Sequence, residues 1–414
     1  MTSQSAVTSI GLLPAPGLGA SAPGSGAKLQ LAAVGTQDLY LRCREGQCYT
    51  FVAAFKRATR FAMWTDEVVI EYTPGTRSSV DIPKSGDLLA DMYLEITLPA
   101  VPGSTEFWSP SVGYTFLKRV RLLLNDAEIH NYERLWYDLY DTLYTSAGHE
   151  AGLADMVGRA PLPLSKSHIL HIPLRMLTGR RGASRPPLPL QAIPRASLKL
   201  DVDWEKPSVL TRQADGTTAL TTDPGIKIKL LCDYVELDEK EKKSVLRGTT
   251  LAFESAIDSD AVSYAIDSDA ALRDVPVIKV NLSNVRFAVK MLVWVAYTEG
   301  VGGPLFTYLP NVLGRITLLF NNQERAAPRP ASYYAAVQTY QHCTRSPIAG
   351  PGVYSFALNA TSRRASGTAD FGALSASVLV AEVLPAAPRF KLKVFSVYYN
   401  FLQIQGASGR VLLV

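Results

Sequence analysis

Histidine and cysteine are scarce in this chain of 414 residues, which holds five histidines and four cysteines. These side chains supply most zinc ligands and many catalytic bases and nucleophiles, so their scarcity leaves little material for such sites. Cys43 and Cys48 are separated by four residues, but neither Cys232 nor Cys343 belongs to a second pair that could complete a zinc site. The motifs of zinc proteases, serine hydrolases and P-loop proteins are also missing. We expect no catalytic, metal or cofactor site, and free thiols in a reducing compartment.

Long apolar runs are missing too, so no membrane-spanning helix is expected. The N-terminus has no basic segment followed by a continuous apolar segment, which argues against a secretory signal. Charged residues make up 19% of the chain and the formal net charge is only +5, so we expect no specific nucleic-acid partner. The densest basic stretch, residues 175–195, is rich in proline and is interpreted as an exposed loop or a subunit contact, with a phosphate-binding site as the alternative.

What the chain does contain is typical of a protein built from strands. Hydrophobic residues make up 47%, and 29 glycines and 26 prolines are scattered along the sequence, as in short strands joined by turns. Residues 198–204 and 226–234 alternate between apolar and polar side chains, which predicts strands with one buried face. Further strands are predicted at 50–56, 92–98, 115–124, 169–174, 277–282, 287–297, 315–320, 353–358, 377–383 and 390–400.

One segment has helical periodicity instead. Apolar side chains between Ile129 and Leu143 recur at spacings of three and four, which predicts a helix with one apolar stripe. Asp126 stands near its start and is the expected N-cap.

Two short polar patterns are candidates for ion binding but have simpler interpretations. His168 and His171 are three residues apart on a predicted strand, so they point to opposite faces and cannot hold one ion together. The sequence Ile-Asp-Ser-Asp occurs at 257–260 and again at 266–269. We interpret it as a polar loop or hairpin, with cation binding by its carboxylates as the alternative.

The chain carries an internal repeat. Residues 122–128 (LLLNDAE) and 318–324 (LLFNNQE) both end a predicted strand with an asparagine turn, and they begin 196 residues apart. This distance is close to half of the length from residue 28 to the end. The second copy leads toward residues 332–341, which could form a second, shorter helix. The repeat predicts two tandem β-domains, each large enough for an eight-stranded jelly roll.

The chain is therefore divided into four parts. Residues 1–27 are rich in Ala, Gly, Ser and Pro and are predicted to form a flexible arm. The first jelly roll is placed at 28–237 and the second at 249–414. Between them, 238–248 begins with the charged run Asp-Glu-Lys-Glu-Lys-Lys, which is the expected linker.

Several segments resemble the major capsid proteins of nucleo-cytoplasmic large DNA viruses. The similar segments follow the family's order and are residues 29–41, 50–63, 85–89 (SGDLL), 92–96 (MYLEI), 322–325, 332–344, 354–358 (YSFAL), 366–371 and 398–404. The sequence departs from the family pattern at Cys343, where a histidine is common, and at Ala369-Asp370, where Cys-Asn is common.

The resemblance implies a double jelly roll that assembles with copies of itself. Three chains would form a capsomer of pseudo-hexagonal outline, and capsomers would tile an icosahedral shell of a large double-stranded DNA virus. Implied partners are neighbouring capsomers, minor capsid and penton proteins, and an internal viral membrane, which the arm 1–27 could contact. The implied location is the virion capsid, assembled inside the host cell in a cytoplasmic virus factory.

The same resemblance implies structural roles for its signature residues. Gly86 and Gly367 would serve turns, Met92 and Leu94 would pack inward, and Tyr354, Phe356 and Leu358 would form the core face of a strand.

Three other functions stay open. A minor capsid paralogue would share the fold. A double-sandwich enzyme acting on glycans would need two carboxylates in a cleft, and the sequence singles out no such pair. A nucleic-acid-binding shell protein would bind with steep salt dependence.

Overall fold

The computed structural model of the chain describes residues 61–176, 187–212, 223–238, 242–243, 250–264, 276–299, 306–347, 350–362, 365–385, 387–405 and 408–412. Several predictions lie outside these residues. They concern the arm 1–27, the predicted strand 50–56, the opening of the family resemblance, Cys43 and Cys48, the second copy of the Ile-Asp-Ser-Asp pattern and most of the segment 238–248.

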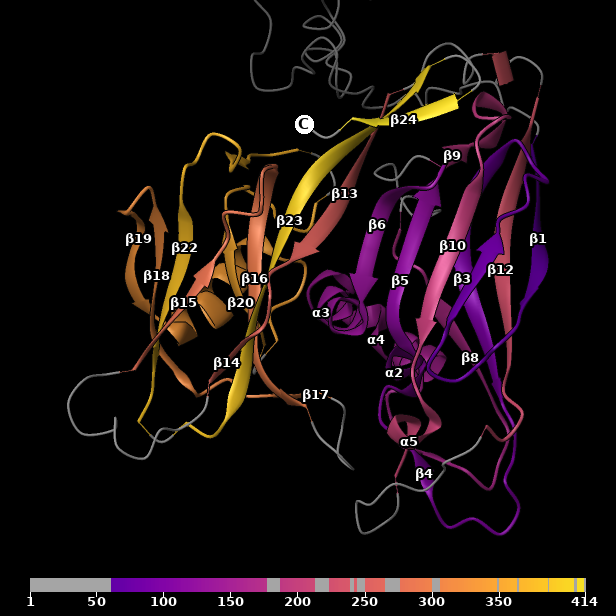
Figure 1. Ribbon diagram of the computed structural model, residues 1–414, viewed down its shortest axis with the longest axis horizontal. Coiled ribbons are helices and arrows are strands. Elements are labelled where there is room, and N and C mark those ends of the chain that lie inside the picture. The colour runs from indigo at the N-terminus through magenta and orange to yellow at the C-terminus, as the bar shows by residue number, and fades with distance from the viewer. Residues whose placement is uncertain are drawn as a thin grey trace, which may run out of the picture. The chain divides into compact units, whose positions relative to one another are not determined.

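The first half of the chain forms two antiparallel sheets (Figure 1). The strands of one sheet, in spatial order, are β1 (Phe61–Ile70), β12 (Lys227–Leu237), β3 (Leu88–Leu98) and β8 (His168–Pro173). Those of the other are β2 (Arg77–Asp81), β10 (Leu198–Trp204), β5 (Leu117–Leu124) and β6 (Ala127–Glu133). Short elements between them are β4 (Phe107–Trp108), α2 (Val112–Phe116), α3 (Arg134–Tyr144), α4 (Ala147–Val157), β7 (Leu162–Pro163), β9 (Leu188–Pro189), the 3-10 turn η1 (Leu190–Ala192), α5 (Pro207–Leu210) and β11 (Thr211–Arg212).

The second half repeats this plan (Figure 1). Its first sheet contains β13 (Thr250–Asp258), β23 (Phe390–Gln405), β16 (Ala288–Glu299) and β20 (Gly352–Ser355) in spatial order. Its second sheet contains β15 (Val277–Asn281), β22 (Ser377–Val383), β18 (Leu313–Phe320) and β19 (Gln323–Pro330). Additional elements are β14 (Val262–Tyr264), β17 (Phe306–Tyr308), the π-helix η2 (Tyr333–Gln338), α7 (Thr339–His342), β21 (Ala369–Asp370) and β24 (Ser408–Leu412).

Both halves use the same strand order. When the eight main strands of each half are counted along the chain, one sheet runs first, eighth, third, sixth and the other runs second, seventh, fourth, fifth. Two sheets with these crossovers form a jelly roll. The fold is therefore a double jelly roll, as predicted, and we call the halves the first and second sandwich.

Most predicted strands are present, and β10 and β22 have the predicted bounds. The predicted strand 115–124 is shorter, because residues 115 and 116 end helix α2. The prediction for 353–358 was also wrong at its end. The backbone turns after Ser355, whose hydroxyl accepts a hydrogen bond from the Ala357 N–H at 3.1 Å, so Leu358 is 79% exposed and belongs to no core.

The predicted helix 129–143 begins too early. Residues 127–133 form strand β6, which pairs with β5, and the helix α3 starts only at Arg134. The side chains of Ile129 and Tyr132 are buried on this strand, so their spacing of three imitated a helical stripe. Asp126 caps no helix, since it lies in the turn before β6.

The repeated asparagine turn is confirmed in both halves. Asn125 and Asp126 connect β5 to β6 with φ values of 51° and 61°, and Asn321 and Asn322 connect β18 to β19 with 50° and 63°. Two consecutive positive φ values are typical of the type I′ hairpin, in which asparagine is well tolerated. The Asn321 side-chain oxygen also accepts hydrogen bonds from the N–H groups of Ser375 and Ala376, at 2.9 and 3.1 Å. As predicted, a helical segment follows the second turn, formed by η2 and α7.

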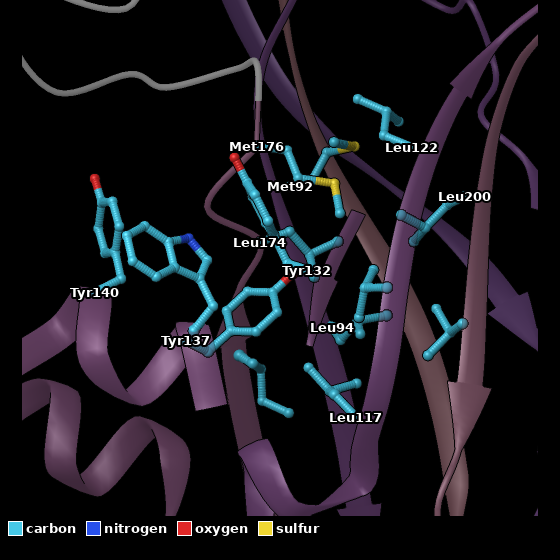
Figure 2. Packing of buried hydrophobic residues seen from close by; sticks show 14 of the residues in the cluster. Met92, Leu94, Leu117, Leu122, Tyr132, Tyr137, Tyr140, Leu174, Met176 and Leu200 are labelled. Carbon is cyan, nitrogen blue, oxygen red and sulfur yellow. The ribbon is translucent and has the colours of Figure 1, made fainter. Parts of the chain in front are cut away.

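The core of each sandwich lies between its two sheets. Met92 and Leu94 of β3 are fully buried, as expected, and pack with Leu122 and Leu200 of the facing sheet (Figure 2). The strands that carry them alternate between buried and half-buried positions, so each contributes one face to this core.

The Gly-Asp-Leu signature closes the first sandwich. A side chain at Gly86 would lie only 2.8 Å from Cβ of Tyr234, so this bend needs glycine. The neighbouring Asp87 is buried, and its carboxylate accepts hydrogen bonds from the N–H of Leu237 at 2.8 Å and pairs with Lys242 at 3.1 Å. The signature therefore fixes the end of β12. At Gly367, φ is 141° and a Cβ would lie 2.6 Å from the Phe356 carbonyl, so glycine is required there as well.

A buried ion pair joins α3 to the segment after β8. The guanidinium of Arg175 lies 3.1 Å from Asp141, which is 2% exposed and accepts a hydrogen bond from Tyr114. Arg175 is thus not part of an exposed loop, contrary to the prediction for 175–195; residues 177–186 lie outside the described residues. Burial raises the pKa of Asp141 above its ordinary value, and the charge of Arg175 opposes that rise.

We predict that Arg175→Met destabilises the fold by about 3 kcal/mol at pH 7, because it leaves a buried carboxylate without its counter-charge. The pKa of Asp141 should then rise further, so the folded state binds this proton more tightly than the unfolded state, whose pKa is about 4. Stability from such a group is lost as the pH rises. Urea unfolding should therefore show a smaller loss at pH 5 than at pH 7. Arg195→Met, at an exposed site, is the control; a larger loss at pH 5 would contradict the assignment.

We predict that Asn321→Ala destabilises the protein by about 2 kcal/mol, because alanine disfavours a positive φ and cannot accept the hydrogen bonds from Ser375 and Ala376. Asn321→Gly removes only the hydrogen bonds and should cost about half as much. Thermal and urea unfolding of both variants would measure the difference, and equal losses would show that φ is not the constraint.

Candidate functional site

The first sheet of the second sandwich is buried on both faces. Residues 289–297 of β16 and 392–400 of β23 are all buried, whereas the equivalent strands β3 and β12 alternate. One face, including Leu292 and Trp294, belongs to the core of the second sandwich. The other face, including Met291, Val293 and Phe395, belongs to the same apolar cluster as the core of the first sandwich. This second face and the residues of the first sandwich that cover it form what we call the junction.

The first sandwich contributes β6 and α3 to the junction. Trp136 of α3 packs on Phe395 with ring centroids 5.3 Å apart, and His130 of β6 packs on Phe253 at 5.1 Å. His130 is 1% exposed, and its Nδ1 lies 3.3 Å from the Ser255 hydroxyl. The junction therefore excludes water from one edge of the first sandwich as well as from the sheet it covers.

A buried lysine lies within this sheet. Lys290 is fully buried; its ammonium pairs with Glu254 and donates to the Ser362 carbonyl at 3.2 Å. The ammonium also lies over the rings of Tyr144 and Tyr399, 5.6 and 5.4 Å from their centroids. A buried cation needs such partners, since an unpaired charge in an apolar interior is costly.

A second group of charges crosses the junction. The Lys393 ammonium lies 2.6 Å from Glu133 of the first sandwich and 2.7 Å from Asp258 of the second. The guanidinium of Arg119 lies 3.9 Å from both carboxylates. We call these four residues the junction tetrad; it contains two cations and two anions and is electrically neutral.

The paired charges around Lys290 and in the junction tetrad are suited to holding strands and helices together. Burial raises the pKa of the Cys232 and Cys343 thiols to about 12, so both stay protonated near neutral pH and are poor nucleophiles. His168 and His171 lie on opposite faces of β8, where His168 bonds to the Pro163 carbonyl and His171 lies 3.4 Å from Glu95. Within the residues that the structure describes, no group of three or more His, Cys, Asp or Glu could hold a metal ion, and no helix is long and apolar enough to cross a membrane.

The first sheet of the first sandwich can be aligned with the first sheet of the second sandwich, because both contain a β-bulge. In the first sandwich the pairing of β3 with β12 shifts at Ala90, and in the second the pairing of β16 with β23 shifts at Lys290. Counting from the bulge places Lys229 opposite Glu95 in the first sheet and Lys393 opposite Val295 in the second. The same alignment makes Leu231 equivalent to Phe395 and Glu67 equivalent to Asp258.

On the first sandwich, the residues that the structure describes leave the face equivalent to the junction uncovered. Here the side chains of Glu67, Lys229, Glu95 and His171 form a ladder across β1, β12, β3 and β8, with neighbouring polar atoms 2.8, 4.0 and 3.4 Å apart. The exposed apolar side chains Val69 and Ile169 lie on the same face. We call this surface the ladder face.

On the second sandwich, nothing in the described part of the chain covers the edge equivalent to β6. Every residue of β19 except Ala326 is exposed, and so is Arg315 of β18, which pairs with the end of β19 as Arg119 pairs with the end of β6. We call Arg315 and β19 the arginine edge, since Arg325 and Arg329 also belong to it.

None of the junction residues was identified from the sequence. A signal was present: β16 reads AVKMLVWVAYTE, an apolar run with one lysine and no alternation. Such a run is typical of a strand buried on both faces. The first Ile-Asp-Ser-Asp copy was interpreted as a loop, but Asp258 ends β13 and pairs with Lys393.

Two family models match the chain. Residues 49–238 match the N-terminal part of the major capsid protein, and residues 283–409 match the large eukaryotic DNA virus major capsid protein. The major capsid protein of Pyramimonas orientalis virus is 27% identical over 93% of this chain and 98% of its own. That of Paramecium bursaria Chlorella virus 1 is 24% identical over 86% of each.

Solved structures share the fold. A chain in a quasi-atomic model of the PBCV-1 virus capsid has a TM-score of 0.75 at 20% identity, covering 88% of this chain and 99% of that one. The Faustovirus major capsid protein has a TM-score of 0.62 at 11% identity, covering 87% and 93%.

We predict that Lys393→Met destabilises the protein by about 3 kcal/mol, because it leaves Glu133 and Asp258 partly buried with only the distant Arg119. The matched control is Lys229→Met at the equivalent exposed position, where loss of a surface ion pair should cost less than about 1 kcal/mol. Urea unfolding of dilute protein would compare the two. Equal losses would show that the junction tetrad is not a buried network.

Proposed function

Because the chain belongs to the family of large eukaryotic DNA virus major capsid proteins, we propose that three copies close into one capsomer in which six sandwiches surround a common axis. The family role is structural and not enzymatic, and its place is the virion capsid, where capsomers contact their neighbours in the lattice. The trimer is the unit that we propose for this chain.

One observation carries the proposal. The chain has two sandwiches of equal strand order and one junction, and the described residues leave the counterparts of both halves of that junction uncovered, one on each sandwich. A surface with two different complementary halves makes a head-to-tail contact, which gives a closed ring when the rotation closes. In a closed ring of three copies, each uncovered counterpart would contact the complementary counterpart on a neighbouring copy.

The partners proposed for the arm, together with the penton proteins, are inferred from the sequence alone. We propose that residues 1–27, which are nearly uncharged and rich in small residues, lie on the inner side of the shell and become ordered on assembly. Their contacts there would be the internal membrane or minor capsid proteins, while penton proteins would fill the fivefold positions. Assembly would take place in a cytoplasmic virus factory. A shell of unchanged stability after deletion of 1–27 would contradict the role of the arm.

We also propose the boundaries 28–237, 238–248 and 249–414 for the first jelly roll, the linker and the second jelly roll. Limited proteolysis with cleavage confined to 238–248 would support the linker. High abundance of the chain in purified particles would separate a major from a minor capsid protein.

We predict that the purified chain sediments as a trimer of about 135 kDa, three times the mass of 45.0 kDa, and forms hexagonal arrays at high concentration. Analytical ultracentrifugation and negative-stain electron microscopy would test this. A strictly monomeric protein without arrays would overturn the proposal.

A further inference from the structure

We propose that the ladder face of one copy packs against the arginine edge of the next copy, in the way that the two sandwiches pack at the junction. This inference rests on the proposed trimer and names the two surfaces that would hold it together. The occupant of the ladder face is therefore a second copy of this chain.

The first argument is positional. The bulge alignment makes the ladder face the counterpart of the sheet face that the junction covers, residue by residue. On the other side, the pairs of β18 with β19 nearest the asparagine turn repeat those of β5 with β6: Leu122 pairs with His130, and Leu318 pairs with Ala326. Farther along, β19 has one residue more than β6, so Arg119 pairs with Glu133 and Arg315 pairs with Pro330. Each sandwich thus carries one surface that forms the junction and one equivalent surface that the described residues leave uncovered.

The second argument is burial. At the junction Phe395 is 2% exposed, while its equivalent Leu231 on the ladder face is only half-buried. On the edge, Ala127 and Glu128 are the exposed residues of β6, whereas every residue of β19 except Ala326 is exposed. The surfaces buried by the junction therefore have equivalents that no part of the described chain covers.

The third argument is charge. The junction tetrad balances Lys393 and Arg119 against Asp258 and Glu133. In the proposed contact, Lys229 takes the position of Lys393, Glu67 takes that of Asp258, and Arg315 takes that of Arg119. The position of Glu133 is held by Pro330.

The ladder face supplies the missing anion. Glu95, whose equivalent in the junction is the buried Val295, lies 4.0 Å from Lys229. Arg315 and Lys229 against Glu67 and Glu95 again make two cations and two anions. Complementary charge of this kind fixes partner and register.

The test is a charge swap. Arg315→Glu places a glutamate against Glu67 and Glu95, so it should raise the dissociation constant of the trimer by at least about tenfold in analytical ultracentrifugation. Arg315→Glu combined with Glu67→Arg restores opposite charges across the contact and should recover most of that loss. Both positions are exposed, so circular dichroism and thermal unfolding of the monomer should stay close to those of the wild type.

The control is Arg389→Glu, which makes the same charge change at an exposed loop position before β23, outside both surfaces, and should leave the trimer intact. A wild-type trimer that Arg315→Glu does not weaken, or that the double variant does not restore, would overturn the inference while leaving the trimer in place. A wild-type monomer would overturn the proposed function itself.

Discussion

The sheet of β13, β23, β16 and β20 is the element on which the rest of the structure depends, because both of its faces are buried. One face closes the core of the second sandwich and the other is covered by β6 and α3 of the first. If the two sandwiches separated, a continuous apolar sheet face would be exposed to water. At about 25 cal/mol per Å² of apolar surface, such exposure is strongly unfavourable. The two sandwiches therefore form one folding and functional unit.

The polar groups in that sheet explain its specificity. An apolar face alone would tolerate sliding, since apolar contacts have no preferred direction. The ammonium of Lys290 lies over the Tyr144 ring of the first sandwich, and Lys393 pairs with Glu133 across the junction, so both lysines find these partners in only one register. Buried ion pairs add little net stability, but a register that leaves one partner unpaired is costly. The apolar face thus supplies affinity, and the paired lysines select the alignment.

Strand positions and the tandem plan could be predicted from the sequence because they follow from local pattern. Alternation located β10 to the residue, the strand predicted at 377–383 coincides with β22, and the asparagine turns marked the same hairpin in each half. Errors came where tertiary contacts override that pattern: the strand β6 looked helical because Ile129 and Tyr132 are buried from different sides, and Leu358 follows a turn made by the Ser355 side chain. The junction residues were missed because alternation vanishes in a strand with two buried faces, and only comparison of β16 with β3 reveals what that means.

The first sheets of the two sandwiches show how the same strand order can give a permanent contact in one sandwich and a reversible contact in the other. At the bulge the second sandwich carries Lys290, buried and paired, where the first has Ala90. Phe395 and Val295 at the junction are replaced by Leu231 and Glu95 on the ladder face, which keeps that face hydrated in the free chain. Exposed ion pairs contribute less than about 1 kcal/mol each, so a contact made through the ladder face would be weaker than the junction and sensitive to salt. A trimer held by such contacts can release and rebind its copies, whereas each chain stays intact.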